Sequence, residues 1–115
     1  MSAYALAHLR PVAKPHEEVY EYMEHIQATM DPFGGRFVVH GAPVEVREGE
    51  RPGGLVIIEF PSIEQAREWY DSPAYQAILR LRADHIPGDL VLVDGTEPDH
   101  DSAAMAAALR AAANQ

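Results

Sequence analysis

The chain has 115 residues, of which 47% are apolar, so its length fits one domain with a single core and its composition is not that of a disordered protein. Its 9 basic and 18 acidic residues give a formal net charge of −9, which argues against nucleic-acid binding because the chain repels a phosphate backbone. The absence of cysteine excludes disulfides, thiolate nucleophiles and zinc–thiolate sites.

The first half of the chain is predicted to form a strand, a helix, a second strand and a short ribbon. The segment AYALAHLR (3–10) fits a strand, although alanine is a weak strand former. A helix opens at Lys14-Pro15, with acidic residues in its first turns where the helix dipole favours them, and it ends before Asp31-Pro32. RFVVHG (36–41) is the second strand, and VEVREGERPGG (44–54) is a ribbon and turn.

The second half is predicted to form a strand, an interrupted helix and a last strand. LVIIEF (55–60) is followed by Ser62, which caps the next helix, with Gln65 in the capping-box position. At Asp71-Ser72-Pro73 the helix breaks, because the residue before a proline is pushed out of the α region, and Ser72 caps a new helix. A catalytic elbow is the alternative explanation of this break, but helix capping accounts for it without one. DLVLVDG (89–95) is the last strand.

The element order predicts a ferredoxin-like βαββαβ sandwich of the α+β class, with an antiparallel sheet and helices on one face. We expect this domain to span residues 1–96. Residues 97–115 are predicted to be a polar linker and an extra alanine-rich C-terminal helix, capped at Asp101 or Ser102. That helix is only marginally stable alone and needs a surface on which to pack.

Alternation of side chains along the strands predicts one apolar side and one mixed side for each of the first three strands. The mixed side is expected to carry Tyr4, Leu6, His8, Arg36, Val38, His40, Leu55, Ile57 and Glu59. The helices should cover the apolar sides. The open mixed face is too apolar to meet water, so we predict a homodimer whose two sheets face each other and enclose a small apolar pocket with a few polar groups.

Several stretches resemble the domain-of-unknown-function family 1330 over roughly residues 3–95: GGRF, EFPS, the helical corner WYDSPAYQ and DLVLVDG. The resemblance implies a dimeric α+β barrel, a fold shared by small monooxygenases and isomerases of antibiotic and aromatic metabolism, and it implies no particular reaction. The family-like positions are Arg36, Glu45, Glu59, Tyr70, Ser72, Tyr75 and Arg82. Members of the family often have arginine where this chain has His40, so a permanent cation is missing there and a group able to act as acid or base takes its place.

The catalytic pair predicted on the mixed face is His40 as general base and Glu59 as the carboxylate that orients it. The alternative is a purely structural ion pair at the dimer interface. Arg36 is predicted to hold a ligand oxygen, and its alternative role is to pair with Glu45 or Glu48 at the rim.

Four further residues are predicted to contact the ligand: Tyr75, His8, Tyr4 and Ser72. For His8 the alternative is a structural interface histidine. No HxxxH, HxH or HExxH spacing occurs, so we predict no metal site, and no cofactor is expected because nothing selects one histidine as a haem ligand.

The predicted function is the binding of a small apolar or aromatic ligand. If the protein is an enzyme, the predicted chemistry is cofactor-free proton transfer or oxygenation of an aromatic or polyketide-like compound. The alternative is a non-catalytic ligand carrier or a dimeric assembly module. No apolar run approaches the roughly 20 residues that cross a bilayer, and the N-terminus does not resemble a signal peptide, so we expect a cytoplasmic protein without membrane contact.

Overall fold

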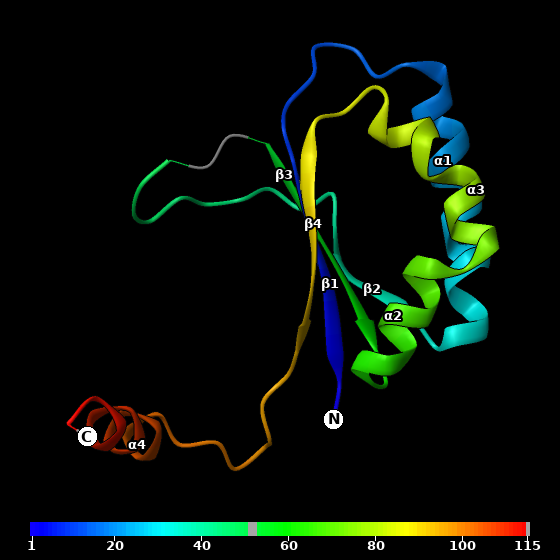
Figure 1. Cartoon of the computed structure of the whole chain (residues 1–115). Coiled ribbons are helices and arrows are strands. Elements are labelled where there is room, and N and C mark those ends of the chain that lie inside the picture. The colour runs from blue at the N-terminus through cyan, green and yellow to red at the C-terminus, as the bar shows by residue number, and fades with distance from the viewer. Residues whose placement is uncertain (51–52, 115) are drawn as a thin grey trace.

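A computed structural model describes residues 1–50 and 53–114, and its main feature is a four-stranded antiparallel sheet with three helices on one face (Figure 1). The elements are β1 (Ala3–Leu9), α1 (Glu17–Met30), the 3-10 turn η1 (Asp31–Phe33), β2 (Arg36–His40), β3 (Gly54–Phe60), α2 (Ile63–Asp71), α3 (Pro73–Ala83), β4 (Gly88–Asp94) and α4 (Ser102–Ala113). The strand order is β2-β3-β1-β4. This arrangement confirms the predicted ferredoxin-like α+β fold.

The corner between α2 and α3 depends on one serine. Ser72 ends α2 and begins α3: its hydroxyl donates a hydrogen bond to the Trp69 carbonyl at 2.7 Å and accepts one from the Tyr75 backbone N–H at 3.2 Å. Ser62 caps α2 in the same way, accepting from the Gln65 N–H at 3.2 Å. Both predicted caps are confirmed, and helix capping explains the break in the helical pattern.

Two predicted boundaries differ from the structure. α1 begins at Glu17 rather than at Lys14-Pro15, because His16 serves as its N-cap and accepts the Glu18 N–H at Nδ1, 3.0 Å away. The ribbon predicted over 44–54 is absent from residues 44–50, which form an irregular loop, and residues 51–52 lie outside the described part of the chain.

The core lies between the sheet and α1–α3. Ala3, Ala5 and Ala7 of β1 face the helices and are buried, as predicted, while the largest fully buried side chains are Trp69, Tyr75, Phe60 and Met30. Small alanines on the strand and large aromatics on the helices are complementary in volume. This layer therefore buries Trp69, Tyr75 and Phe60 completely.

A β-bulge at Val38 changes the direction of the side chains that follow it in β2. Phe37 pairs with Ile58, but the next partner of β3, Ile57, faces Val39, and His40 pairs with Val56. Val38 is the extra residue, so the alternation shifts by one position beyond it. His40 consequently lies on the helix-covered side with Val56, and the prediction that it shares the open face with Glu59 is wrong.

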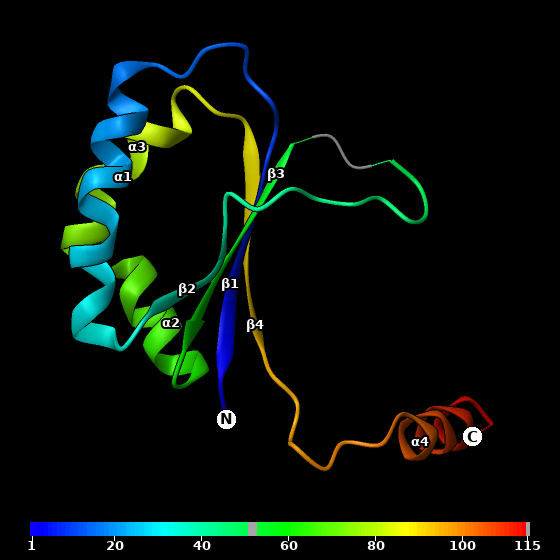
Figure 2. The ribbon, with the colours of Figure 1, turned by 180° about the vertical axis from the view of Figure 1, so that it is seen from behind.

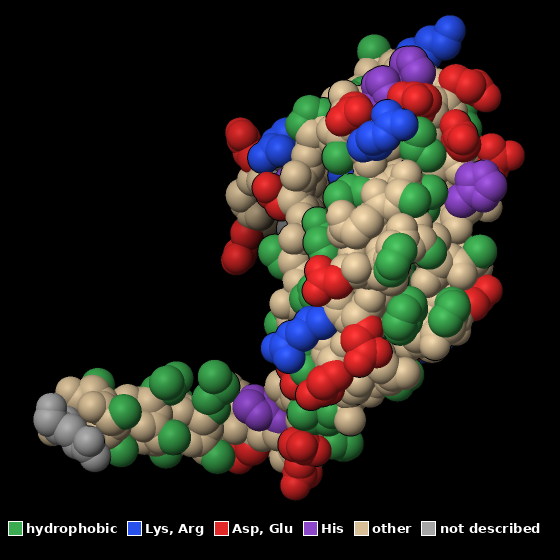
Figure 3. Space-filling model, turned by 45° about the vertical axis from the view of Figure 1, so that its right-hand side comes forward, with side chains coloured by type: hydrophobic (Ala, Val, Ile, Leu, Met, Phe, Trp, Pro, Cys, Tyr) green, Lys and Arg blue, Asp and Glu red, His purple; other side chains and the backbone are tan. Residues whose placement is uncertain are grey.

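The C-terminal helix α4 stands apart from the other helices. Asp101 caps it by accepting the Ala103 N–H at 3.0 Å, and every described residue of α4 is exposed. Figures 1 and 2 place α4 on the opposite side of the sheet from α1–α3, the side toward which the loop after β2 also extends. Figure 3 shows it projecting from the body with apolar side chains along its length. Neither α4 nor any other described helix is long and apolar enough to cross a membrane.

Candidate functional site

A cavity of about 290 Å³ lies between the covered face of the sheet and the helices. Its walls are mainly apolar, with small side chains such as Ala5 and Ala7 from β1 and larger ones such as Met23 and Ile26 from α1. The polar or aromatic side chains that reach it are Tyr22, Phe37, His40, Trp69 and Arg82. An apolar enclosure with a few converging polar groups is the usual form of a small-molecule site.

The guanidinium of Arg82 is the most unusual group in this wall. Arg82 is only 8% exposed, and its Cζ lies 5.7 Å from the centre of the Tyr22 ring. The Tyr22 and Tyr75 hydroxyls are joined by a hydrogen bond of 2.9 Å. Among residues 1–50 and 53–114, no carboxylate forms an ion pair with Arg82. The cavity is thus bordered by a buried cation that has aromatic and hydroxyl neighbours but no counter-ion within the described part of the chain.

The protonation states around Arg82 are set by its surroundings. Burial, and then the neighbouring Tyr75, raise the pKa of Tyr22 far above its usual value, so the Tyr22 phenol stays protonated. Burial acts to lower the pKa of Arg82, but Tyr22 and Tyr75 more than offset it and the net pKa is raised. Arg82 and Tyr22 are therefore suited to hold an oxygen of a ligand and unsuited to remove a proton from it.

His40 stands at the mouth of the same cavity. Its ring stacks on Phe37 with centroids 4.2 Å apart and an interplanar angle of 11°, and the residue is exposed. Histidine is the side chain that enzymes use most often for general acid–base catalysis. Of the side chains that line the cavity, His40 is therefore the one whose chemistry suits a general acid or base.

The open face of the sheet holds a different polar group. Glu59 is bound by Arg36, with Nη2 at 2.7 Å and Nε at 2.9 Å from Oε1, and the Tyr4 hydroxyl donates to Oε2 at 3.4 Å. The pairing of Glu59 with both Tyr4 and Arg36 across neighbouring strands produces this arrangement. Arg36 therefore pairs with Glu59 and not with Glu45, whose carboxylate lies 3.7 Å from Arg47.

The residues predicted to form one site are divided between the two faces. His40, Ser72 and Tyr75 belong to the covered side, whereas Tyr4, His8, Arg36 and Glu59 belong to the open side. The Ser72 hydroxyl is engaged in both helix caps, and Tyr75 is fully buried behind Tyr22. The pairing of His40 with Glu59 as base and orienting group is not present, although the role of each residue in ligand binding stays a prediction.

Sequence reasoning did not assign Tyr22 to the site. Tyr22 belongs to the apolar stripe of α1, and a tyrosine in such a stripe is a weak signal because most of them only pack. Arg82 had a stronger signal, since it is a charged residue within the apolar pattern of α3 and a family-like position. Outside the cavity, the described residues contain one group of three potential metal ligands, His16, Glu18 and His85.

Comparison with known proteins places this geometry in a family. A family model described as a domain of unknown function (DUF1330) matches residues 2–96. The chain belongs to this family. Helix α4 lies outside the matched residues.

Solved structures share the fold of this DUF1330 protein at low sequence identity. A protein of unknown function from Rhodopseudomonas palustris has a TM-score of 0.64 and 21% identity, with 84% of this chain and 84% of that chain covered. SnoaB, a cofactor-independent oxygenase from Streptomyces nogalater, has a TM-score of 0.52 and 12% identity, with 87% and 96% covered. Rv0793 from Mycobacterium tuberculosis has a TM-score of 0.50 and 15% identity, with 87% and 100% covered. These identities establish a common fold and nothing about the reaction, and no curated protein sequence matches the chain.

Proposed function

We propose that this DUF1330 protein binds a small aromatic compound carrying an anionic oxygen, in the cavity between the sheet and the helices. The observation that supports the proposal is the buried guanidinium of Arg82, which has no carboxylate partner among the described residues. A buried charge is costly unless it is paired, and a carboxylate, phenolate or enolate oxygen of a ligand supplies the missing partner. A guanidinium also matches the shape of a carboxylate, with which it forms two parallel hydrogen bonds.

The cavity sets the size of the ligand and its orientation. Its volume of about 290 Å³ lies just below the usual range of ligand pockets, about 300 to 1,000 Å³, so it suits a compound of one or two rings. The ring system packs against the apolar wall and Trp69. The anionic oxygen lies toward Arg82 and the Tyr22 hydroxyl, and the opposite end of the compound lies near His40 at the mouth.

This orientation allows proton transfer without a cofactor. His40 accepts a proton from an activated carbon or phenol, while Arg82 and Tyr22 stabilise the oxyanion that forms. In a second reaction of the same carbanion, a CH₂ group between aromatic rings reacts with O₂ and becomes a carbonyl, with one oxygen atom entering the product and the other leaving as water. SnoaB has the same fold and is a cofactor-independent oxygenase, so the fold is compatible with this second reaction.

Ligand binding is tested by calorimetry with aromatic acids and phenols, each compared with its neutral methyl ester or ether. We expect the anionic compounds to bind, and Arg82→Met to weaken their binding at least tenfold because it removes the charge and keeps an apolar stem. Arg36→Met is the matched control on the open face, where the side chain is 68% exposed and already paired with Glu59, and it should leave binding unchanged. Equal binding of the neutral compounds, or loss of binding in Arg36→Met instead, would contradict the proposal.

The distinction between an enzyme and a ligand carrier depends on His40. For a compound that binds, solvent deuterium incorporation and O₂ consumption are measured with the wild type and with His40→Gln. An enzyme turns over in the wild type, and the variant keeps binding while losing turnover. A wild type that binds the compound and shows neither reaction is a carrier, the alternative function.

We also propose that the open face pairs with a second copy of the chain. The proposal is supported by the side chains of β4 on that face, Val91 and Val93, which are 54% and 47% exposed and lie beside Leu6 and Tyr4 in the sheet register. Apolar surface of this kind favours association. Light scattering should give twice the chain mass for the wild type and one chain mass for Val91→Lys. Ala77→Lys, which adds the same charge to an exposed position of α3, should stay dimeric, and a monomeric wild type at micromolar concentration would contradict the proposal.

A further inference from the structure

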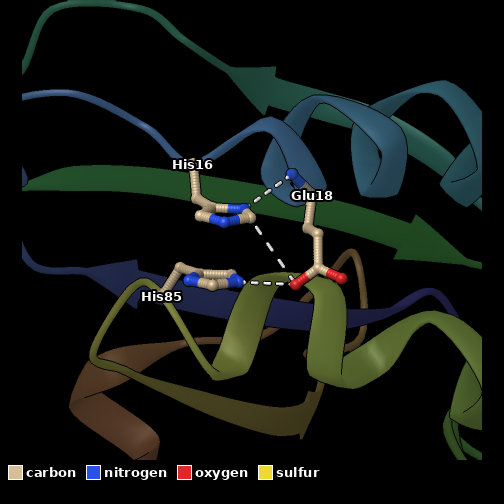
Figure 4. A network of polar contacts seen from close by, with 3 residues as sticks. All are labelled: His16, Glu18 and His85. Carbon is tan, nitrogen blue, oxygen red and sulfur yellow. Dashed lines mark hydrogen bonds and ion pairs between the residues drawn. The ribbon is translucent and has the colours of Figure 1, made fainter.

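Two histidines and a glutamate meet where the start of α1 contacts the turn after α3 (Figure 4). His16 is the N-cap of α1, Glu18 lies in its first turn, and His85 follows the C-cap of α3. The His85 Nε2 lies 2.7 Å from Glu18 Oε1, and the His16 Nδ1 lies 4.0 Å from the same oxygen. One donor atom from each residue lies within 4.8 Å of the other two.

The rings of His16 and His85 lie parallel and close together beside the Glu18 carboxylate. They stack with centroids 3.9 Å apart and an interplanar angle of 3°, and Figure 4 shows a nitrogen of each ring on the edge that faces the Glu18 carboxylate. The backbone holds His85 in place, since its N–H donates to the Arg82 carbonyl at 3.0 Å. Because α1 and α3 pack along their length, both sides of the cluster are supported by rigid elements.

We propose that His16, Glu18 and His85 bind a divalent transition-metal ion, for which Zn²⁺ is the best match. Two imidazoles and a carboxylate are a known zinc donor set, with bonds of about 2.0 to 2.2 Å and a fourth position open to water. Tetrahedral coordination at those bond lengths separates the donor atoms by roughly 3.4 Å. The 2.7 Å contact needs to open slightly and the contacts to His16 need to close, which tilts the two stacked rings. The His16 Nδ1 must also release the Glu18 N–H that it accepts at 3.0 Å, since its one lone pair then binds the metal.

The charge around the cluster limits the affinity without excluding binding. The Glu18 carboxylate is ionised, since the hydrogen bond to His85, opposed by burial, lowers its pKa. The net charge of −9 attracts cations to the molecule as a whole, whereas Arg80 lies close enough to act on Glu18 and opposes a second positive charge. We therefore expect binding in the micromolar range.

A metal ion at this position would join two segments that border the cavity. Val19 and Ile86, the chain neighbours of Glu18 and His85, both line it. The ion would thus fasten the start of α1 to the turn after α3 and fix that end of the cavity wall. This inference does not depend on the proposed ligand or reaction.

The test is calorimetric titration of the full chain with ZnCl₂ after treatment with a chelator and buffer exchange. We expect one ion per chain and a rise in the melting temperature on binding. His85→Ala should weaken binding at least tenfold, and so should His16→Asn, in which the asparagine oxygen keeps the helix cap while the imidazole is lost. His25→Ala, which removes an exposed histidine of α1 outside the cluster, is the matched control and should bind as the wild type does.

Circular dichroism establishes that each variant is folded, and Glu18→Gln provides a further variant of almost unchanged shape that should also bind more weakly. The inference is overturned if the wild type releases no heat of binding at 100 μM ZnCl₂, about a hundred times a micromolar Kd. It is equally overturned if His85→Ala and His16→Asn bind as the wild type does, or if His25→Ala loses binding to the same extent as they do.

Discussion

The two faces of the sheet carry charged residues in opposite circumstances. On the open face, Arg36 and Glu59 satisfy each other, and Tyr4 adds a hydroxyl to the same carboxylate. On the covered face, Arg82 is buried beside a cavity and has no carboxylate partner among the described residues. Two charges that neutralise each other need no counter-ion from a ligand. A buried cation without a carboxylate partner does need a counter-ion, and a ligand can supply it. The comparison favours the covered face as the ligand site and the open face as an association surface.

The largest expected difference between the faces concerns packing. Trp69 is fully buried, and its indole N–H donates to the Thr29 hydroxyl at 3.0 Å, so Trp69→Ala should lower the free energy of unfolding by about 3 to 5 kcal/mol. Val93→Ala, on the open face, should change it by no more than about 0.5 kcal/mol in an isolated subunit. Urea denaturation followed by circular dichroism measures both.

The same measurement at two protein concentrations sharpens the comparison. If a second copy covers Val93, the effect of Val93→Ala should grow with concentration, because association then contributes to the stability of the folded state. An effect of Trp69→Ala as small as that of Val93→Ala would show that the layer beneath the helices is not the core.

A smaller loss of stability is expected from a change at the corner between α2 and α3. Ser72→Ala removes a buried hydroxyl that caps α3 and binds the end of α2, and it should lower the free energy of unfolding by about 1 to 2 kcal/mol. Ser102→Ala is the control, since Ser102 is exposed at the start of α4 and the cap there comes from Asp101. Ser102→Ala should leave the free energy of unfolding almost unchanged. If both variants lower the free energy of unfolding equally, Ser72 does not have the capping role described above.

The smallest expected effect on stability comes from the charged residues of the open face. A hydrogen bond from the Ser2 hydroxyl, opposed by burial and assisted by Arg36, lowers the pKa of Glu59 below its usual value. A lowered carboxyl pKa stabilises the fold above the ordinary value of about 4.3, and this stabilisation is lost as the pH falls through the lower folded-state value. The wild type should therefore melt slightly above Glu59→Gln at pH 7, and the difference should shrink below about pH 4. If the difference in melting temperature between the wild type and Glu59→Gln grows as the pH falls, the pKa of Glu59 is raised in the folded state and the prediction is wrong.

Local patterns predicted the parts of the fold that depend on near neighbours. Ser62 and Ser72 were assigned as caps from residues three positions away or fewer, and the structure has both bonds. The alanines of β1 were assigned to the covered face because alternation holds along an uninterrupted strand. Features of this kind are encoded within a few residues of sequence.

The sequence-based predictions failed where a single bulged residue changes which face of the sheet a side chain occupies, or where a contact joins distant segments of the chain. An apolar residue in a bulge has the same appearance in the sequence as one in a regular strand, so nothing marked Val38 as the extra residue that places His40 on the other face. The meeting of Glu18 with His85 joins positions 67 residues apart, and no spacing rule for a single helix detects it. The burial of Arg82 is likewise a result of tertiary packing.

The wall of the cavity also contains an intrinsic fluorophore. The chain has a single tryptophan, and Trp69 borders the space in which we place the ligand. All indole fluorescence of the protein therefore originates there, without contributions from other sites. Entry of an aromatic compound should quench or shift that emission directly, so an unlabelled sample in a plate reader is sufficient to search a chemical library for the natural occupant.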